Sequence, residues 1–264
     1  MQISSRTKLY YIFLIVGLLI TGLIVWLTVS SSIAGKNITA FLFSEQYRTM
    51  FLSGIVAAGI SCFIGLFISF YFVLRLRKTT SFELFFFSAA AFTMIFEAAR
   101  FVTLLLYFSK NYVFIIDTVS RAVISARFLG ILCLLMGSLY PCGLNQSSIF
   151  QYFIGLLLLA IFFAVLQPVN SGTMDSSFLS AIGNSKAYYA VTIFMSLATV
   201  ANYFVAGKND SVFVNAGFLI AGFMISRQIL QYAAGMVQVI IAGIVCAASA
   251  IIYIKILFTR YMWD

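Results

Sequence analysis

Hydrophobic residues in this chain form long, nearly unbroken runs that are separated by short polar or charged stretches. A helix needs about 20 consecutive apolar residues to cross the hydrocarbon core of a bilayer. Eight runs approach that length, so the pattern predicts eight membrane-spanning helices. The expected spans are about 9–29, 50–74, 82–108, 113–140, 149–167, 187–206, 211–231 and 233–257.

Composition places the chain in the same class. Of its 264 residues, 63% are hydrophobic and only 9% are charged, whereas soluble domains have about 45–50% apolar and about 25% charged residues. Eight spans use most of this length, which leaves no room for a separate soluble domain. The expected fold is therefore all-α, a polytopic transmembrane helix bundle in contact with a lipid bilayer.

The basic residues are divided unevenly between the two sides of the membrane that these spans define. Eight lie on the side of the N-terminus and four on the other, and the first group includes the Arg75-Leu76-Arg77-Lys78 cluster. Cytoplasmic loops carry the excess of Lys and Arg in membrane proteins. We therefore expect both termini to be cytoplasmic, in a bacterial inner membrane, with the longest connections, about 30–49 and 168–186, outside. This asymmetry accounts for the net charge of +9, and we expect no nucleic-acid partner.

Two roles fit the first hydrophobic segment. Arg6 and Lys8 precede it, and Ser32-Ile33-Ala34 has the small-x-small form of a signal-peptidase site. The segment is either a retained anchor, which gives eight helices, or a cleaved signal, which leaves seven. We accordingly separate residues 1–34, the anchor or signal segment, from a single seven-helix transmembrane domain at 35–264.

The residue types present exclude many enzyme classes. The chain has no histidine, which removes His-ligated haem, the usual catalytic zinc sites and His-based triads. Its four cysteines have no CxxC spacing, and nucleotide-binding and nucleophile-elbow motifs do not occur. Glu97 and Asp117 are a candidate carboxylate pair for acid–base work, yet each has an arginine within one helical turn, which favours an ionised structural role. We expect no enzyme activity, no metal site and no cofactor.

Six charged residues fall inside the expected spans and away from their ends, where charge is costly. Each costs at least about 2.5–3.5 kcal/mol if it is left alone at the bilayer centre. They must therefore face one another, water or a ligand. The six are Glu97 and Arg100 in the third span, Asp117, Arg121 and Arg127 in the fourth, and Arg227 in the seventh.

These charges are expected at one depth, in the extracytoplasmic half of the membrane. Glu97 and Arg100 are three residues apart and Asp117 and Arg121 are four apart, so each pair can meet on one helix face. Only Arg127 is near mid-membrane, turned by about 120° from Arg121, and we expect it to address a different neighbour. The candidate ligand-binding residues are Glu97, Arg100, Asp117, Arg121, Arg127, Arg227, Gln228 and Gln231, with Gln238 as a further member.

The candidate site carries more positive than negative charge. Two carboxylates balance two of the four arginines, which leaves a formal surplus near +2 where charge is expensive. Guanidinium groups bind carboxylates and phosphates bidentately. The expected ligand is therefore an anionic small molecule or lipid that enters from outside or from the outer leaflet. The alternative is a set of buried ion pairs that fixes the helix positions without serving any ligand.

Two stretches of the chain resemble a known class of membrane protein. Phe96-Glu97-Ala98-Ala99-Arg100 and the stretch from Ser120 to Gly130 (SRAVISARFLG) are similar to the membrane unit of bacterial seven-helix sensor proteins, over about 80–230. The resemblance implies a receptor unit that feeds a kinase or cyclase. Only a few residues follow the eighth span, so we expect any output to need a separate partner protein.

Three functions fit these features. The first is a receptor or sensor-like protein that binds an anionic or amphipathic ligand and acts through a cytoplasmic or membrane protein partner. The second is a transporter or lipid-handling subunit that moves an anionic substrate past Arg127. The third is a non-catalytic structural subunit of a membrane complex, in which the ion pairs serve architecture alone.

Overall fold

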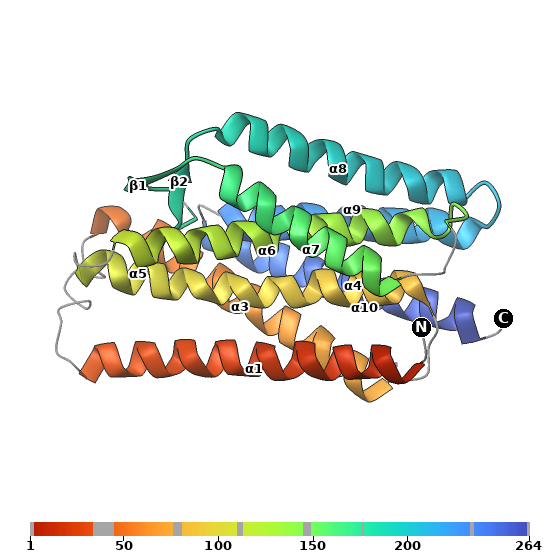
Figure 1. The fold of residues 1–264 in the computed structure, drawn as a ribbon, viewed down its shortest axis with the longest axis horizontal. Coiled ribbons are helices and arrows are strands. Elements are labelled where there is room, and N and C mark those ends of the chain that lie inside the picture. Colours follow the sequence, from red (N-terminus) through yellow and green to blue (C-terminus); the bar gives the residue numbers. More distant parts are fainter. Residues whose placement is uncertain are drawn as a thin grey trace.

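A computed structural model shows a bundle of long helices that run roughly along one axis (Figure 1). The connection around 34–44 lies outside the described residues, and with it the boundary between 34 and 35 and Ala34 of the signal-peptidase motif. The structure describes residues 3–33, 45–75, 81–109, 113–144, 149–175, 177–232 and 235–262. In chain order the helices are α1 (Ile3–Ile33), α3 (Glu45–Arg75), α4 (Phe82–Thr93), the 3-10 helix η1 (Met94–Ala98), α5 (Ala99–Ser109), α6 (Val113–Leu139), α7 (Ile149–Leu166), α8 (Ser185–Ala206), α9 (Ser211–Tyr232) and α10 (Met236–Met262).

Within the described residues, eight helical segments are long and apolar enough to cross a membrane, which confirms the predicted all-α, eight-span fold. The third span is made of α4, η1 and α5 in succession. The last span, Met236–Tyr261, ends later than predicted. Its helix carries Lys255 and Arg260 in its final turns, where long basic side chains can reach the membrane interface while their stems stay apolar.

The outer surface of the bundle is apolar as well as its core. Phe162, Phe194 and Ile244 are 60%, 72% and 65% exposed, each on a different helix. Exposed apolar surface on this scale is unfavourable in water and is normal where a protein meets hydrocarbon. The surface therefore fits contact with a lipid bilayer.

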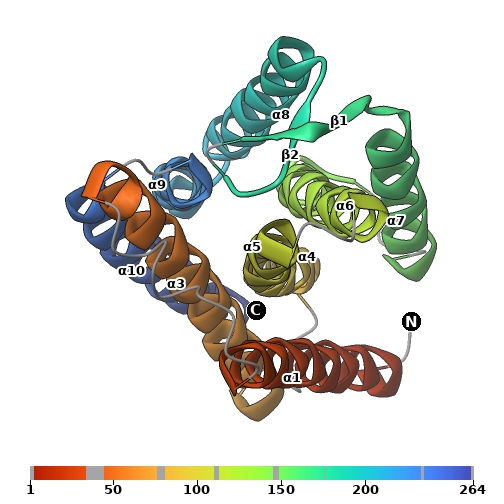
Figure 2. The ribbon, with the colours of Figure 1, turned by 90° about the vertical axis from the view of Figure 1, so that its left-hand side faces the viewer.

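The third span forms the centre of the bundle. Viewed end on, α4 and α5 are surrounded by the other helices (Figure 2). Phe85, Phe86 and Phe87 are at most 1% exposed, because the surrounding helices enclose α4. Phe85 packs against Phe153 of α7, and Phe87 packs against Tyr253 of α10. This aromatic run is core packing.

The first turn of α1 and the last turn of α10 lie at the same end of the bundle (Figure 1). The connection between α7 and α8 lies at the opposite end and forms the only sheet in the described residues, an antiparallel hairpin of β1 (Val169–Met174) and β2 (Ser180–Ile182). The sequence predicted a long connection here but no strands, because neither short segment has an alternating pattern. The hairpin folds inward, since Ser177 at its tip is 1% exposed.

Cysteine labelling tests the predicted orientation. Cys142 follows the C-terminal end of α6 and is exposed, whereas Cys62, Cys133 and Cys246 are buried. The spans alternate in direction, so this end of α6 is on the side where α1 begins (Figure 1). If both termini are cytoplasmic, a membrane-impermeant maleimide should label the protein only after the cells are opened. Partial burial raises the pKa of the Cys142 thiol, so labelling should be faster at alkaline pH.

Two results would be decisive in this assay. Labelling of intact cells would put the Cys142 end outside and contradict the orientation predicted from the basic residues. A Cys142→Ser variant should stay unlabelled in intact and opened cells, because the other three thiols are buried.

Candidate functional site

One buried carboxylate is the centre of the candidate site. Glu97 lies in η1, and side chains at i and i+3 eclipse in a 3-10 helix because it has three residues per turn. Arg100 follows at that spacing, with its Nη1 3.5 Å from Glu97 Oε2. Arg127 reaches across from α6, and its Nε and Nη2 donate to the two carboxylate oxygens at 2.8 Å each. Such a bidentate pair is the strong form of a guanidinium–carboxylate interaction.

A third arginine completes a group that we call the arginine cluster: Glu97, Arg100, Arg127 and Arg227, all at most 4% exposed. Arg227, from α9, donates through Nη2 to Thr93 Oγ1 at 3.0 Å and more weakly to the backbone oxygen of Arg127 at 3.5 Å. Its Nε and Nη1 have no hydrogen-bond partner among the described residues. Buried polar groups are nearly always hydrogen-bonded. Arg227 is therefore the member of the cluster with hydrogen-bond donors that remain available for a ligand.

The arginine cluster has a net positive charge. One carboxylate against three guanidinium groups leaves a formal surplus of +2. This surplus equals the predicted one, although it arises from a different set of residues. In a low-dielectric interior such a surplus is unfavourable unless an anion or water compensates it.

Space for Arg227 depends on Gly130 of α6. A Cβ atom at position 130 would overlap Nη1 and Nη2 of Arg227 and Oγ1 of Thr93. In a helix interior, glycine lowers helix stability by about 1 kcal/mol relative to alanine. This loss is offset here because only glycine lets the Arg227 guanidinium lie against the backbone of α6.

The β1–β2 hairpin covers the arginine cluster at its end of the bundle. Arg100 Nε donates to the backbone oxygen of Ser177 at 2.7 Å, and its Nη1 donates to that of Leu230 at 3.3 Å. The ring of Phe178 is 5.9 Å from the Arg100 guanidinium, and the Phe178 carbonyl accepts from Thr103 Oγ1 at 2.6 Å. Phe178 has φ of 60°, which is strained for a bulky residue. These contacts hold the hairpin tip in place despite that strain.

Asp117 and Arg121 do not join the arginine cluster, contrary to the expectation from their depth. Asp117 Oδ1 accepts from Ser180 Oγ at 2.9 Å and so anchors the hairpin. Arg121 Nη1 donates to three backbone oxygens at the C-terminal end of α7, at 3.0, 2.8 and 3.2 Å, where unpaired carbonyls favour a cation. The expected pair between Asp117 and Arg121 is not among the ion pairs of the described residues. A spacing of four permits contact, but each side chain has a partner on another element instead.

Arg127 has a different neighbour from Arg121, which confirms the prediction from the helical angle. Besides Glu97, it contacts Tyr232 at the end of α9. Arg127 Nη1 donates to the Tyr232 hydroxyl at 3.4 Å, and the guanidinium carbon is 5.4 Å from the ring centroid. Tyr232 thus covers the α9 side of the Glu97–Arg127 pair.

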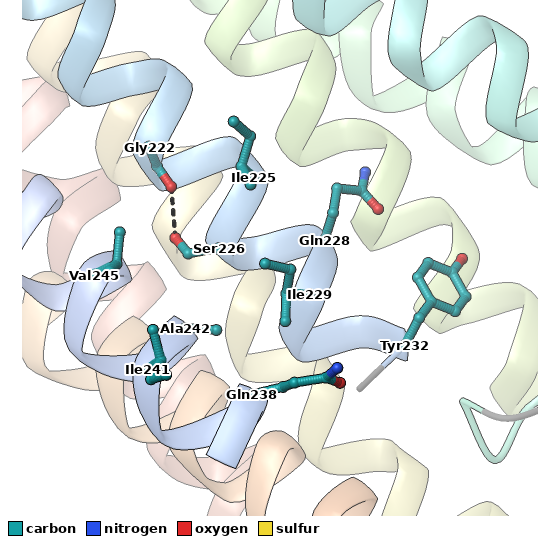
Figure 3. A pocket seen from close by; sticks show the side chains of 10 residues that line it. All are labelled: Gly222, Ile225, Ser226, Gln228, Ile229, Tyr232, Gln238, Ile241, Ala242 and Val245. Atoms are coloured by element: carbon teal, nitrogen blue, oxygen red, sulfur yellow. Dashed lines mark hydrogen bonds between the residues drawn. The ribbon is translucent and has the colours of Figure 1, made fainter. Parts of the chain in front are cut away.

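Tyr232 also lines a groove between α9 and α10 (Figure 3). Its cavity volume is about 770 Å³, and Gln228, Tyr232 and Gln238 supply polar atoms at one end. The rest of the lining is mostly apolar and consists of Gly222, Ile225, Ser226, Ile229, Ile241, Ala242 and Val245. Figure 3 shows the Gln238 side chain reaching from α10 toward the end of α9. A second cavity of about 500 Å³ between α8 and α9 shares Gln228 and Tyr232. The predicted residue Gln231 is instead buried, at 3% exposed.

Five residues that shape the site were not among the predicted ligand-binding residues. They are Thr93, Gly130, Ser177, Phe178 and Tyr232. Two signals were available, because Gly130 follows Arg127 by three residues on one helix and Tyr232 closes the span that carries Arg227. No sequence pattern around Ser177 and Phe178 indicated that they would contact the site. Their role depends on where the hairpin folds, which no pattern along the chain encodes.

The fold defines a class of protein but no family. The part of the chain that the structure describes has eight helices long and apolar enough to span a membrane, and their outer surfaces are apolar. These features define a multi-pass helical membrane protein. Comparisons with protein-family models, with curated proteins and with solved structures found no match to this chain. Function must therefore be inferred from the chemistry of the site.

Proposed function

We propose that this protein is a membrane receptor or sensor-like protein that binds an anionic or amphipathic ligand at the arginine cluster and acts through a partner protein. The observation that carries the proposal is Arg227, whose Nε and Nη1 are buried without a partner in a cluster with a formal charge of +2. Charged groups inside a membrane bundle are expensive and usually serve a function. A carboxylate or phosphate oxygen that accepts from either nitrogen would reduce the charge surplus.

The groove between α9 and α10 supports an amphipathic ligand. Its polar end carries Gln228, Gln238 and Tyr232, and Tyr232 also contacts Arg127 of the cluster. Apart from Ser226, its remaining lining is apolar and includes Ile225 and Ile241. A lipid-like molecule could lay its hydrocarbon tail along the isoleucines and hold its head group next to the positive cluster.

The contacts of the cluster offer a route from ligand to response. Arg100 ties the hairpin to the end of α9 through the backbone oxygens of Ser177 and Leu230. An anion at Arg227 would change the electrostatic balance between Glu97 and the arginines and thereby bias the position of α9. A partner that contacts α9 or α10 would sense that change.

Removing the guanidinium of Arg227 should abolish ligand binding. We expect native mass spectrometry of the gently solubilised wild-type protein to show a stoichiometric anionic adduct, and the Arg227→Gln variant to lose it, because glutamine keeps a polar group but removes the charge. Added phosphatidylglycerol, phosphatidylcholine and inorganic phosphate distinguish a lipid head group from a free anion. The matched control is Arg121→Gln, since Arg121 binds carbonyls of α7 outside the cluster.

The outcomes separate the proposed function from its alternatives. An adduct that survives Arg227→Gln, or a folded wild-type protein that is bare with every probe, would contradict the binding site. A structural-subunit role is then favoured, and one observation already agrees with it: Glu97, Arg100 and Arg127 are satisfied by one another and by the hairpin. The same bidentate pair weighs against transport past Arg127, because it holds that side chain in place.

A further inference from the structure

A second buried glutamate lies in the same span as Glu97, in different surroundings. Glu83 is the second residue of α4, at the end of the bundle where α1 begins, and it is 1% exposed. It lies at the very edge of the expected third span and is not one of the six charges predicted within the spans. Its burial makes it as costly to ionise as Glu97, so its partners decide its charge.

The two carboxyl groups differ in the hydrogen bonds and ion pairs that compensate their charge. Glu97 accepts two hydrogen bonds from Arg127 and lies 3.5 Å from Arg100. Glu83 accepts one hydrogen bond, from the hydroxyl of Tyr261 to Oε1 at 2.7 Å, and its Oε2 is buried with no partner among the described residues. None of the ion pairs between described residues includes Glu83.

Among the described residues, the other groups around Glu83 offer no full counter-charge. Arg260 of α10 interacts with Glu83 electrostatically, but its Nε is 2.7 Å from Asp210 Oδ2, which already balances it. The remaining described titratable side chains that interact with Glu83 are phenols or a thiol, which are neutral near pH 7. They are Tyr253 and Tyr261 of α10, Tyr203 of α8 and Cys142 beyond α6, with the Tyr203 and Tyr253 hydroxyls 2.6 Å apart.

We propose that Glu83 is a proton-binding site, with the proton on Oε2 and the Tyr261 hydroxyl donating to Oε1, whereas Glu97 stays ionised. A neutral carboxylic acid needs no counter-ion in a low-dielectric interior, and an unpaired carboxylate there would be strongly unfavourable. Tyr261 is on α10 and Glu83 on α4, so movement between these helices would change the environment of the proton. On release, the proton leaves Oε2 for water and the carboxylate remains. This inference does not depend on an anion binding at Arg227.

Infrared difference spectroscopy tests the charge of Glu83 directly. At neutral pH, the wild-type protein should show the C=O stretching band of a protonated carboxylic acid, and Glu83→Gln should lose it. Asp117→Asn is the matched control and should keep the band, because Asp117 is only half-buried and accepts a hydrogen bond from Ser180. Tyr261→Phe should keep the band but shift it to higher frequency, since a hydrogen bond to the carbonyl oxygen weakens the C=O bond.

The background in this experiment is small, since the chain has only seven Asp and Glu residues. The absence of a protonated-acid band in the wild type, or its persistence in Glu83→Gln, would overturn the proposal. If Glu83→Gln fails to fold, glutamate labelled with carbon-13 in the wild-type protein shows whether the band comes from a glutamate, and the shift in Tyr261→Phe assigns it to Glu83 among the three glutamates. The band must then shift with the label, and a band that does not shift comes from an aspartate and refutes the assignment.

Discussion

Replacing Glu97 with glutamine is expected to lower the stability of the folded protein by about 3–5 kcal/mol, because removing one partner of a buried ion pair leaves the other charge uncompensated. Glu97 is 2% exposed, accepts two hydrogen bonds from Arg127 and lies 3.5 Å from Arg100. With an amide in its place, the arginine cluster keeps three guanidinium groups and no carboxylate. Thermal unfolding in detergent, followed with a thiol-reactive dye that reports exposure of the three buried cysteines, measures the loss.

A double-variant cycle separates the ion pair from general damage to the core. Arg127→Gln alone should also destabilise, and the combination with Glu97→Gln should cost less than the sum of the two, because the pair is then removed whole. Asp117→Asn is the control, since it loses one charge-assisted hydrogen bond from Ser180 at a half-buried position and should cost about 1–2 kcal/mol. If Glu97→Gln unfolded at the same temperature as Asp117→Asn, Glu97 would not be the centre of the cluster.

Replacing Gly130 with alanine should destabilise the bundle by about 1–3 kcal/mol, the usual cost of overpacking a core, and should also displace Arg227. The new Cβ atom would overlap both terminal nitrogens of Arg227 and Oγ1 of Thr93. At the surface an arginine could swing away at little cost. Here the guanidinium is buried, and moving it breaks its hydrogen bond to Thr93. We therefore expect a lower unfolding temperature and loss of any adduct that depends on Arg227.

Gly59 of α3 provides a matched control for Gly130. It is exposed, and a Cβ atom there would meet nothing within 4 Å. Gly59→Ala should be neutral or stabilising by up to about 1 kcal/mol, because alanine favours the helix. Equal unfolding temperatures for Gly130→Ala and Gly59→Ala would show that Arg227 does not need the space beside α6.

The spans could be predicted closely because insertion into a bilayer depends on a local quantity, the length of an apolar run. The prediction was less accurate at the last span, where the helix continues beyond the expected end at 257 and carries Arg260. It also left residues 168–186 without structure. The hairpin in this connection is held by Ser177 and Ser180, whose partners lie about 60 or more residues away along the chain.

The candidate site was predictable in part. The cost of charge in hydrocarbon indicated that six charges within the spans must face one another, water or a ligand. Four of them, Glu97, Arg100, Arg127 and Arg227, lie together in the arginine cluster. The cost of charge gave no means to tell which of the charges at similar depth would meet. Arg121 was expected in the same group, yet its guanidinium binds the end of α7, because the direction of a side chain around its helix matters as much as its depth.

The sequence by itself determined an all-α bundle of eight apolar helices and a surplus of positive charge within it, because both follow from residue type and order along the chain. Only the tertiary structure decided that Glu97 in its 3-10 turn would bind Arg127 from another helix and that Gly130 would make room for Arg227. It also decided that the two buried glutamates, Glu97 and Glu83, would differ in their charge-compensating partners. These outcomes depend on how helices rotate and approach one another. A side chain's partner in a membrane bundle usually comes from a different span, and no spacing within one span specifies it.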